Sequence, residues 1–144
     1  MKEFIRAKIQ ENIMNINGIK KSAGVLIKAM DTGRILLVLR NDGSYIPNTW
    51  SMVAGGIEIG ESDLEGLKRE VSEELSIDPN IITYRFKGNE YHLERKSSFS
   101  WYEGLTPKEF IPKLDEENLE HGWFNISELP EPLYPGTLEK INKI

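Results

Sequence analysis

Three glutamates, Glu70, Glu73 and Glu74, follow a glycine-rich segment at residues 54–60. On a helix, with about 100° between residues, these three side chains share an arc of roughly 100°. Like charges so close together repel one another unless a cation neutralises them. Carboxylates suit a hard cation such as Mg²⁺, which also keeps water and phosphate oxygens as ligands. The spacing therefore indicates an oxygen-rich metal site, and a solvated acidic helix face is the alternative.

The glutamates need a helix to carry them, and residues 62–76 show helical periodicity. Four apolar side chains share one stripe of that helix: Leu64, Leu67, Val71 and Leu75. Asp78 and Pro79 end it. Because the glutamate arc borders the stripe, we expect the carboxylates at the edge of the buried face.

The rest of the chain predicts mostly strands. Apolar runs at residues 23–30 and 34–40 flank a turn and predict a hairpin of mostly buried strands. The other expected elements are a loop at 41–44, strands at 50–53, 81–86, 97–105 and 119–124, and a short helix from Tyr134. Isoleucines at positions 5, 9, 13 and 16 leave a helix and an irregular lead-in both open. Strands mixed with helices predict an α+β fold around one sheet.

Length and composition restrict the class of protein. The 144 residues predict a single domain, 1–144, with residues 1–20 as a lead-in segment. A net charge of −5 argues against binding bulk nucleic acid. No cysteine is present, which excludes disulfides and thiolate chemistry, and the two histidines, His92 and His121, favour Mg²⁺ or Mn²⁺ over zinc. Without a long apolar run or secretory signal, we expect no membrane span and a cytoplasmic location.

The segment from Ala54 to Ile77 resembles the Nudix box of the Nudix (MutT-like) hydrolases, G-x5-E-x7-R-E-U-x-E-E-x-G-U, where U is bulky and aliphatic. Eight positions match in register: Gly55, Glu61, Arg69, Glu70, Val71, Glu73, Glu74 and Ile77. Ser76 departs, because the family has glycine there. Serine in a left-handed helix end costs about 1 kcal/mol unless the helix ends differently. The resemblance implies a Nudix-type α/β/α sandwich with a mixed β-sheet.

The resemblance also implies roles for residues of the box. Glu73 and Glu74 correspond to direct metal ligands, and Glu70 to a third ligand or to the group that orients the attacking water. The carbonyl of Ala54 is a further expected ligand. The structural motif, which ties the loop to the helix, comprises Gly55, Gly56, Glu61 and Arg69. Glu58 lies in the loop where many members also carry a carboxylate, and its role stays open.

A second resemblance covers residues 110–136, which are similar to the tail of some bacterial and phage Nudix proteins. Those proteins carry a carboxylate six residues before a tryptophan–aromatic pair, and Trp123 places it at Glu117. We expect Glu117 to be an additional ligand or the general base, with Glu116 and Glu120 as rivals. Many members have histidine after this glutamate, whereas Asn118 follows here. The alternative is a solvated acidic loop.

The implied activity is Mg²⁺-dependent hydrolysis, with Mn²⁺ as a substitute, of a diphosphate linkage in a small nucleotide-like molecule. Glu70, Glu73 and Glu117 are the predicted catalytic residues. The substrate remains open among ADP-ribose or nucleotide sugars, dinucleoside polyphosphates and (d)NTPs. A catalytically weak Nudix module that binds a nucleotide metabolite for regulation is the alternative. An isomerase of isoprenoid diphosphates is a further alternative, because it shares the fold. Its chemistry resembles one that needs a catalytic cysteine, and this chain has none. The family often forms homodimers, so a homodimer is a further expectation.

Substrate contacts are expected from residues outside the box. Arg40 ends a predicted strand and is a candidate partner for phosphate, with a surface charge as the alternative. Trp50 and Trp101 are candidates for stacking on a base or ring, as are Phe99 and Tyr102, and core packing is the alternative for each.

Overall fold

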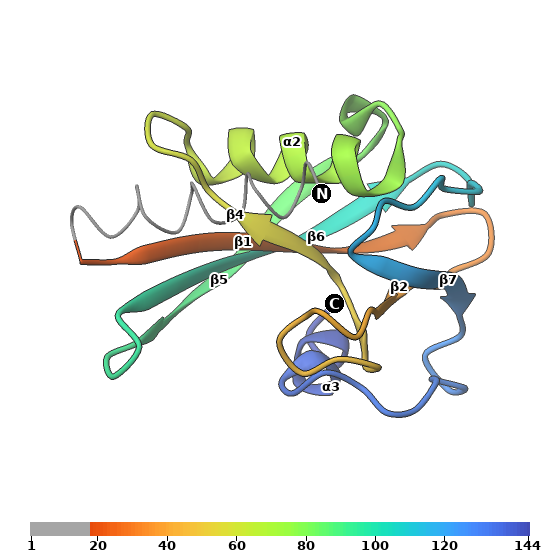
Figure 1. The fold of residues 1–144 in the computed structure, drawn as a ribbon. Coiled ribbons are helices and arrows are strands. Elements are labelled where there is room, and N and C mark those ends of the chain that lie inside the picture. Colours follow the sequence, from red (N-terminus) through yellow and green to blue (C-terminus); the bar gives the residue numbers. More distant parts are fainter. Residues whose placement is uncertain (1–17) are drawn as a thin grey trace.

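One mixed sheet of seven strands organises residues 18–144, the part of the chain that a computed structural model describes. The strands are β1 (Lys20–Ala29), β2 (Ile35–Arg40), β3 (Trp50–Ser51), β4 (Val53–Gly56), β5 (Thr83–His92), β6 (Ser97–Thr106) and β7 (Asn118–Phe124). Helix α2 (Asp63–Leu75) covers one face, and α3 (Thr137–Ile141) lies on the other (Figure 1). A 3-10 turn, η2 (Pro79–Ile81), joins α2 to β5. The predicted α+β sandwich with a mixed sheet is confirmed.

Strand β1 is central, and its partners position the rest. It pairs in parallel with β6 along its whole length and antiparallel with β4 through residues 22–25. The predicted hairpin is present but short, since β1 and β2 pair only at Ile27 with Leu36 and at Lys28 with Ile35. Beyond that point β2 pairs with β3 and β7. The first half of β1 is thereby available to β4, which leads into α2.

Two predicted boundaries need correction. The glycine-rich segment was expected to be a loop from residue 54, but β4 continues to Gly56, because residues 22–25 of β1 hydrogen-bond to it. Strand β5 runs to His92 rather than ending at residue 86, because the long strand β6 pairs with it throughout. The four N-terminal isoleucines and nearly all of the predicted lead-in lie outside the described residues. Within residues 18–144, no helix is long and apolar enough to cross a membrane.

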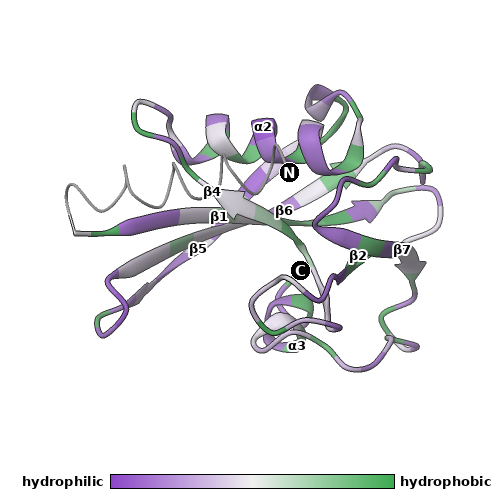
Figure 2. Ribbon diagram, in the orientation of Figure 1, coloured by the Kyte–Doolittle hydropathy of each residue, from purple (hydrophilic) through white to green (hydrophobic). Residues whose placement is uncertain are grey.

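Apolar layers fill both sides of the sheet. The layer under α2 contains the predicted stripe, with Leu67, Val71 and Leu75 fully buried and Leu64 partly buried. The layer under α3 contains Leu26, Ile35, Leu37, Met52, Trp101 and Ile141. Figure 2 shows hydrophobic and hydrophilic residues interspersed along α2, as an amphipathic helix requires. The buried stripe therefore fixes which way the glutamates of α2 face.

Helix α2 is capped at both ends by serines. Ser62 accepts a hydrogen bond from the backbone N–H of Glu65, whose side chain accepts one from the N–H of Ser62. At the other end Ser76 is left-handed, with φ 55° and ψ 43°. Its hydroxyl donates to the carbonyl of Lys113 over 3.0 Å. The helix thus ends in the left-handed conformation that the family reaches with glycine.

A bidentate ion pair ties the β1–β2 turn to the segment after β6. Arg34 donates two 2.6 Å hydrogen bonds to Glu109, and the hydroxyl of Thr32 donates a third. The hydrogen bond from Arg34 is the main reason that the pKa of Glu109 is lowered. A lowered folded-state pKa contributes stability above the ordinary pKa of about 4.3 that is lost as pH falls through the folded value.

Glu109→Gln should therefore lower the melting temperature at about pH 7 by no more than a few degrees, since the pair is only partly buried and is screened by solvent. The difference from the wild type should shrink as the pH is lowered towards about 3, because Glu109 becomes protonated as the pH falls through its lowered folded-state pKa. Thermal unfolding at the two pH values measures it. An equal deficit at both would show that shape, rather than charge, matters at this position.

Candidate metal centre and active site

Three carboxylates meet at the C-terminal half of α2. Oxygens of Glu70, Glu74 and Glu117 lie within 4.8 Å of one another. Glu70 and Glu74, one helical turn apart, are each 3% exposed, and Glu117 lies half-buried just before β7. Carboxylates are almost never fully buried unless they are paired or bind a metal. The arrangement has the donor set of a hard divalent cation.

The end of α2 brings Glu117 to the other two. The last carbonyls of a helix lack partners within it, and here the backbone N–H of Asp115 donates to the carbonyl of Glu74 over 3.3 Å. The side chain of Asp115 then accepts the N–H of Glu117 over 3.1 Å. Asn41, after β2, donates its N–H to the carbonyl of Glu117 over 3.1 Å. The acidic segment is therefore docked on the helix end and held from both sides.

Of the three carboxylates that sequence reasoning left as rivals, only Glu117 belongs to this cluster. Glu116 and Glu120 are exposed. Glu73, a predicted ligand, lies outside the three-carboxylate group, and its side chain, 28% exposed, is 3.6 Å from Arg69. Ala54 lies in β4 beside Gly55. The roles of Glu73 and of the Ala54 carbonyl as ligands stay predictions.

Electrostatics single out Glu74. Burial, followed by the charges of Glu117 and Glu70, raises the pKa of Glu74 well above its usual range, although a hydrogen bond from Asn118 opposes the rise. That bond runs from Nδ2 of Asn118 to Oε1 of Glu74 over 2.9 Å. The other oxygen, Oε2, is buried and has no hydrogen-bond partner among residues 18–144. A divalent cation fits here, because it would satisfy that oxygen and remove the repulsion.

Arg69 connects the loop, the helix and the cluster. Its guanidinium donates two 2.9 Å hydrogen bonds to Glu61, one to the carbonyl of Gly56 and one to Glu70. Glu58 lies 3.9 Å away. Partial burial alone would lower the pKa of Arg69, but the bond to Glu61 and the charge of Glu70 outweigh it and raise the pKa. Arg69 thus stays charged and holds the loop against α2.

Gly55 is required by close approach. A methyl group built on Gly55 would overlap the carboxyl group of Glu70. Only glycine lets β4 pass so near to the helix while Glu70 keeps its orientation. Steric contact with Glu70 therefore explains why position 55 requires glycine.

The predicted substrate contacts lie elsewhere. Trp101 is 4% exposed in the layer under α3, and Trp50 packs edge-on against Phe124, with ring centroids 5.2 Å apart, at the border of the same layer. Both indoles thus lie on the face of the sheet opposite α2. Arg40 donates to the carbonyl of Tyr45 over 3.0 Å and stacks over Tyr134. Contact of Arg40, Trp50 and Trp101 with substrate stays a prediction.

Sequence reasoning missed three site residues. Asn118 was treated only as a departure from the family pattern, yet it is the hydrogen-bond donor to Glu74. Asp115 and Asn41 hold the backbone of Glu117. A signal existed for Asn118 and Asp115, since both belong to the polar run around Glu117, but none existed for Asn41, 76 residues away.

With this geometry in view, the comparisons show that the chain belongs to the NUDIX domain family, whose profile matches residues 18–143. It is similar to an RNA pyrophosphohydrolase of a Nitratiruptor species, 36% identical over 77 residues, which are 51% of this chain and 50% of that protein. It is 43% identical over 54 residues, 38% of this chain and 34% of the relative, to the dihydroneopterin triphosphate diphosphatase of Escherichia coli K12. The matches thus span half or less of these relatives. The MutT NUDIX hydrolase of Burkholderia pseudomallei has the same fold, with a TM-score of 0.70 at 21% identity, covering 88% of this chain and 98% of that one.

Proposed function

We propose that this protein is a Mg²⁺-dependent hydrolase, with Mn²⁺ as a substitute, that cleaves a diphosphate linkage in a small nucleotide-like substrate. The observation that carries the proposal is the cluster of Glu70, Glu74 and Glu117, with one buried oxygen of Glu74 left without a hydrogen bond among residues 18–144. The names of the two curated relatives, a pyrophosphohydrolase and a diphosphatase, support the same bond class.

The residues divide into two groups by exposure. Glu70 and Glu74, both buried, would hold the cation, which when bound neutralises the carboxylates and polarises phosphoryl oxygens. Glu117 and Glu73 are more exposed and are the two candidates to accept the proton of the attacking water. Arg69 keeps Glu70 oriented by its hydrogen bond. In-line positioning and charge neutralisation supply most of the catalysis in such phosphoryl transfers.

The test is product release from a panel of compounds with Mg²⁺ or Mn²⁺. The panel comprises ADP-ribose, nucleotide sugars, dinucleoside polyphosphates, (d)NTPs, dihydroneopterin triphosphate and an RNA oligonucleotide. Glu117→Gln should reduce turnover of the best compound at least about 100-fold. Changing residues that only support metal ligands typically costs about 10- to 100-fold, and Glu117 is proposed to act in the site directly. Glu120→Gln, nearby but exposed, is the matched control and should retain activity. Tight binding of one compound with no turnover of any would instead identify a regulatory binding module.

A further inference from the structure

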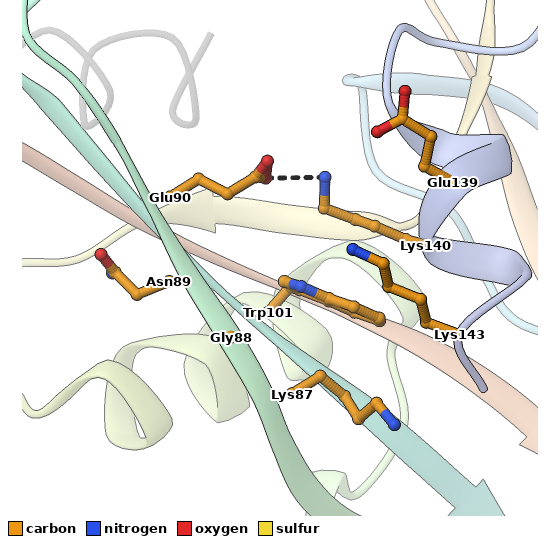
Figure 3. Close-up of a pocket in the computed structure, with 8 residues that line it drawn as sticks. All are labelled: Lys87, Gly88, Asn89, Glu90, Trp101, Glu139, Lys140 and Lys143. Atoms are coloured by element: carbon orange, nitrogen blue, oxygen red, sulfur yellow. Dashed lines mark ion pairs between the residues drawn. The ribbon is translucent and has the colours of Figure 1, made fainter.

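A pocket of about 480 Å³ lies between β5, β6 and α3 (Figure 3). Trp101 and Ile141, of β6 and α3, share the apolar layer on this face, whereas Glu70 and Glu74 project from α2 on the other. The pocket is therefore separate from the carboxylate cluster, and lysines rather than glutamates predominate in its lining. Three lysines line it: Lys87, Lys140 and Lys143.

A β-bulge directs Lys87 into this pocket. The register of β5 against β6 shifts between Phe86, which pairs with Tyr102, and Gly88, which pairs with Trp101. The bulge leaves Lys87 without a strand partner of its own, between the Phe86–Tyr102 and Gly88–Trp101 pairs. Figure 3 shows Lys87 on the pocket side of the strand. A side chain on Gly88 would meet the indole nitrogen at 3.4 Å, so glycine leaves that N–H open to the pocket.

Helix α3 supplies Lys140, and Lys143 lies in the turn two residues after the end of that helix. Lys140 is only 9% exposed, and its Nζ lies 2.7 Å from Glu90 and 6.0 Å from the centre of the Trp101 ring. Lys143 is exposed, and no ion pair within residues 18–144 involves it or Lys87. Glu139 also lines the pocket, so the lining carries three lysines and two glutamates.

The pocket thus holds a local excess of positive charge on a chain whose net charge is −5. One ammonium is paired with Glu90, the other two have no ion pair within the described part of the chain, and an indole N–H adds a further donor. Several donors around one hollow match a ligand with several anionic oxygens. We propose that this pocket binds a phosphorylated group, either the distal phosphate of the hydrolysed substrate or a separate phosphorylated ligand.

Glu90 makes the proposal sharply testable, because it competes with the ligand for Lys140. Glu90→Gln removes that competitor and should strengthen anion binding about threefold, whereas Lys87→Gln/Lys143→Gln should weaken it about tenfold. A merely structural role of these residues would not produce shifts in opposite directions. Lys108→Gln, an exposed lysine outside the pocket, is the matched control.

The probe is tripolyphosphate in the presence of a chelator, measured by titration calorimetry at low salt. The chelator removes any cation that would bridge an anion to the glutamates, so the result does not depend on the proposed hydrolase. Saturable binding that shifts as stated and weakens with added salt would support the pocket. Absence of binding to the wild type, or unchanged binding in the double lysine variant, would overturn it.

Steady-state kinetics on the hydrolysed compound then distinguish the two sources. A raised KM with unchanged kcat in the double lysine variant would assign the pocket to the substrate's distal phosphate. An unchanged KM together with weakened tripolyphosphate binding would assign it to a separate ligand. Both outcomes support the site, and the calorimetry alone decides whether it exists.

Discussion

Replacing Glu74 with glutamine is expected to lower turnover at least about 100-fold while raising the melting temperature of the metal-free protein. The two effects have one cause. In the absence of a cation, the carboxylate of Glu74 is buried beside Glu70 and Glu117, and one of its oxygens has no hydrogen bond among the described residues. Desolvation and repulsion both destabilise the folded state, and glutamine removes the charge that causes them.

Glutamine also suits the site sterically, since its side-chain carbonyl can still accept the hydrogen bond from Asn118. Relief of about 1 kcal/mol would raise the melting temperature by about 2–4 °C for a domain of this size. Without metal, the wild type should melt at a lower temperature than the variant. Adding Mg²⁺ should remove this difference by stabilising the wild type, because a ligand at 100 times its Kd stabilises by about 2.7 kcal/mol. The variant should lose most of that response.

Thermal unfolding with chelator and with Mg²⁺, alongside turnover, measures both effects in one preparation. Glu128→Gln removes one exposed carboxylate away from the cluster and should change neither. A variant that is less stable without metal, yet responds normally to Mg²⁺, would show that Glu74 is a structural carboxyl group rather than a ligand.

The box and its helix were predictable because their geometry is local. Helical periodicity alone places Glu70 and Glu74 at the border of the apolar stripe, and the structure shows both there, buried. The spacing could not separate Glu73 from them, although its side chain lies outside the cluster. A shift of one residue turns a helical side chain by about 100°, and packing of the neighbouring segments decides which carboxylates meet.

Features that depend on distant segments were not predictable. The choice of Glu117 over its neighbours depends on the docking of residue 115 on the end of α2. Its partner Asn41 follows β2, a strand distant in sequence that pairs with β7. The burial of Trp101 depends on the pairing of β6 with β1 and β5. The lysine pocket depends on a β-bulge in β5, which no residue pattern in that strand predicts. Long-range pairing leaves no periodic signal in one sequence.

Arg69→Ala should be the most destabilising single change in the motif, at about 3 kcal/mol. Removing the guanidinium leaves the buried carboxylate of Glu70 and the partly buried one of Glu61 without their shared cation, and the carbonyl of Gly56 without a donor. The lost charge therefore costs more than an exposed ion pair would. Arg69→Lys should recover only part of the loss, because one ammonium cannot reproduce the fork that binds Glu61 through two nitrogens.

Denaturant unfolding of Arg69→Ala, Glu61→Gln and the double variant measures the coupling. If the pair acts as a unit, the double variant should be less destabilised than the sum of the single ones, because removing Glu61 as well leaves one fewer uncompensated carboxylate. Lys68→Ala, a neighbouring cation whose contacts are exposed, should cost below about 1 kcal/mol. Additive losses would mean that Arg69 acts mainly through Glu70, and the Mg²⁺ response would then fall in Arg69→Ala but not in Glu61→Gln.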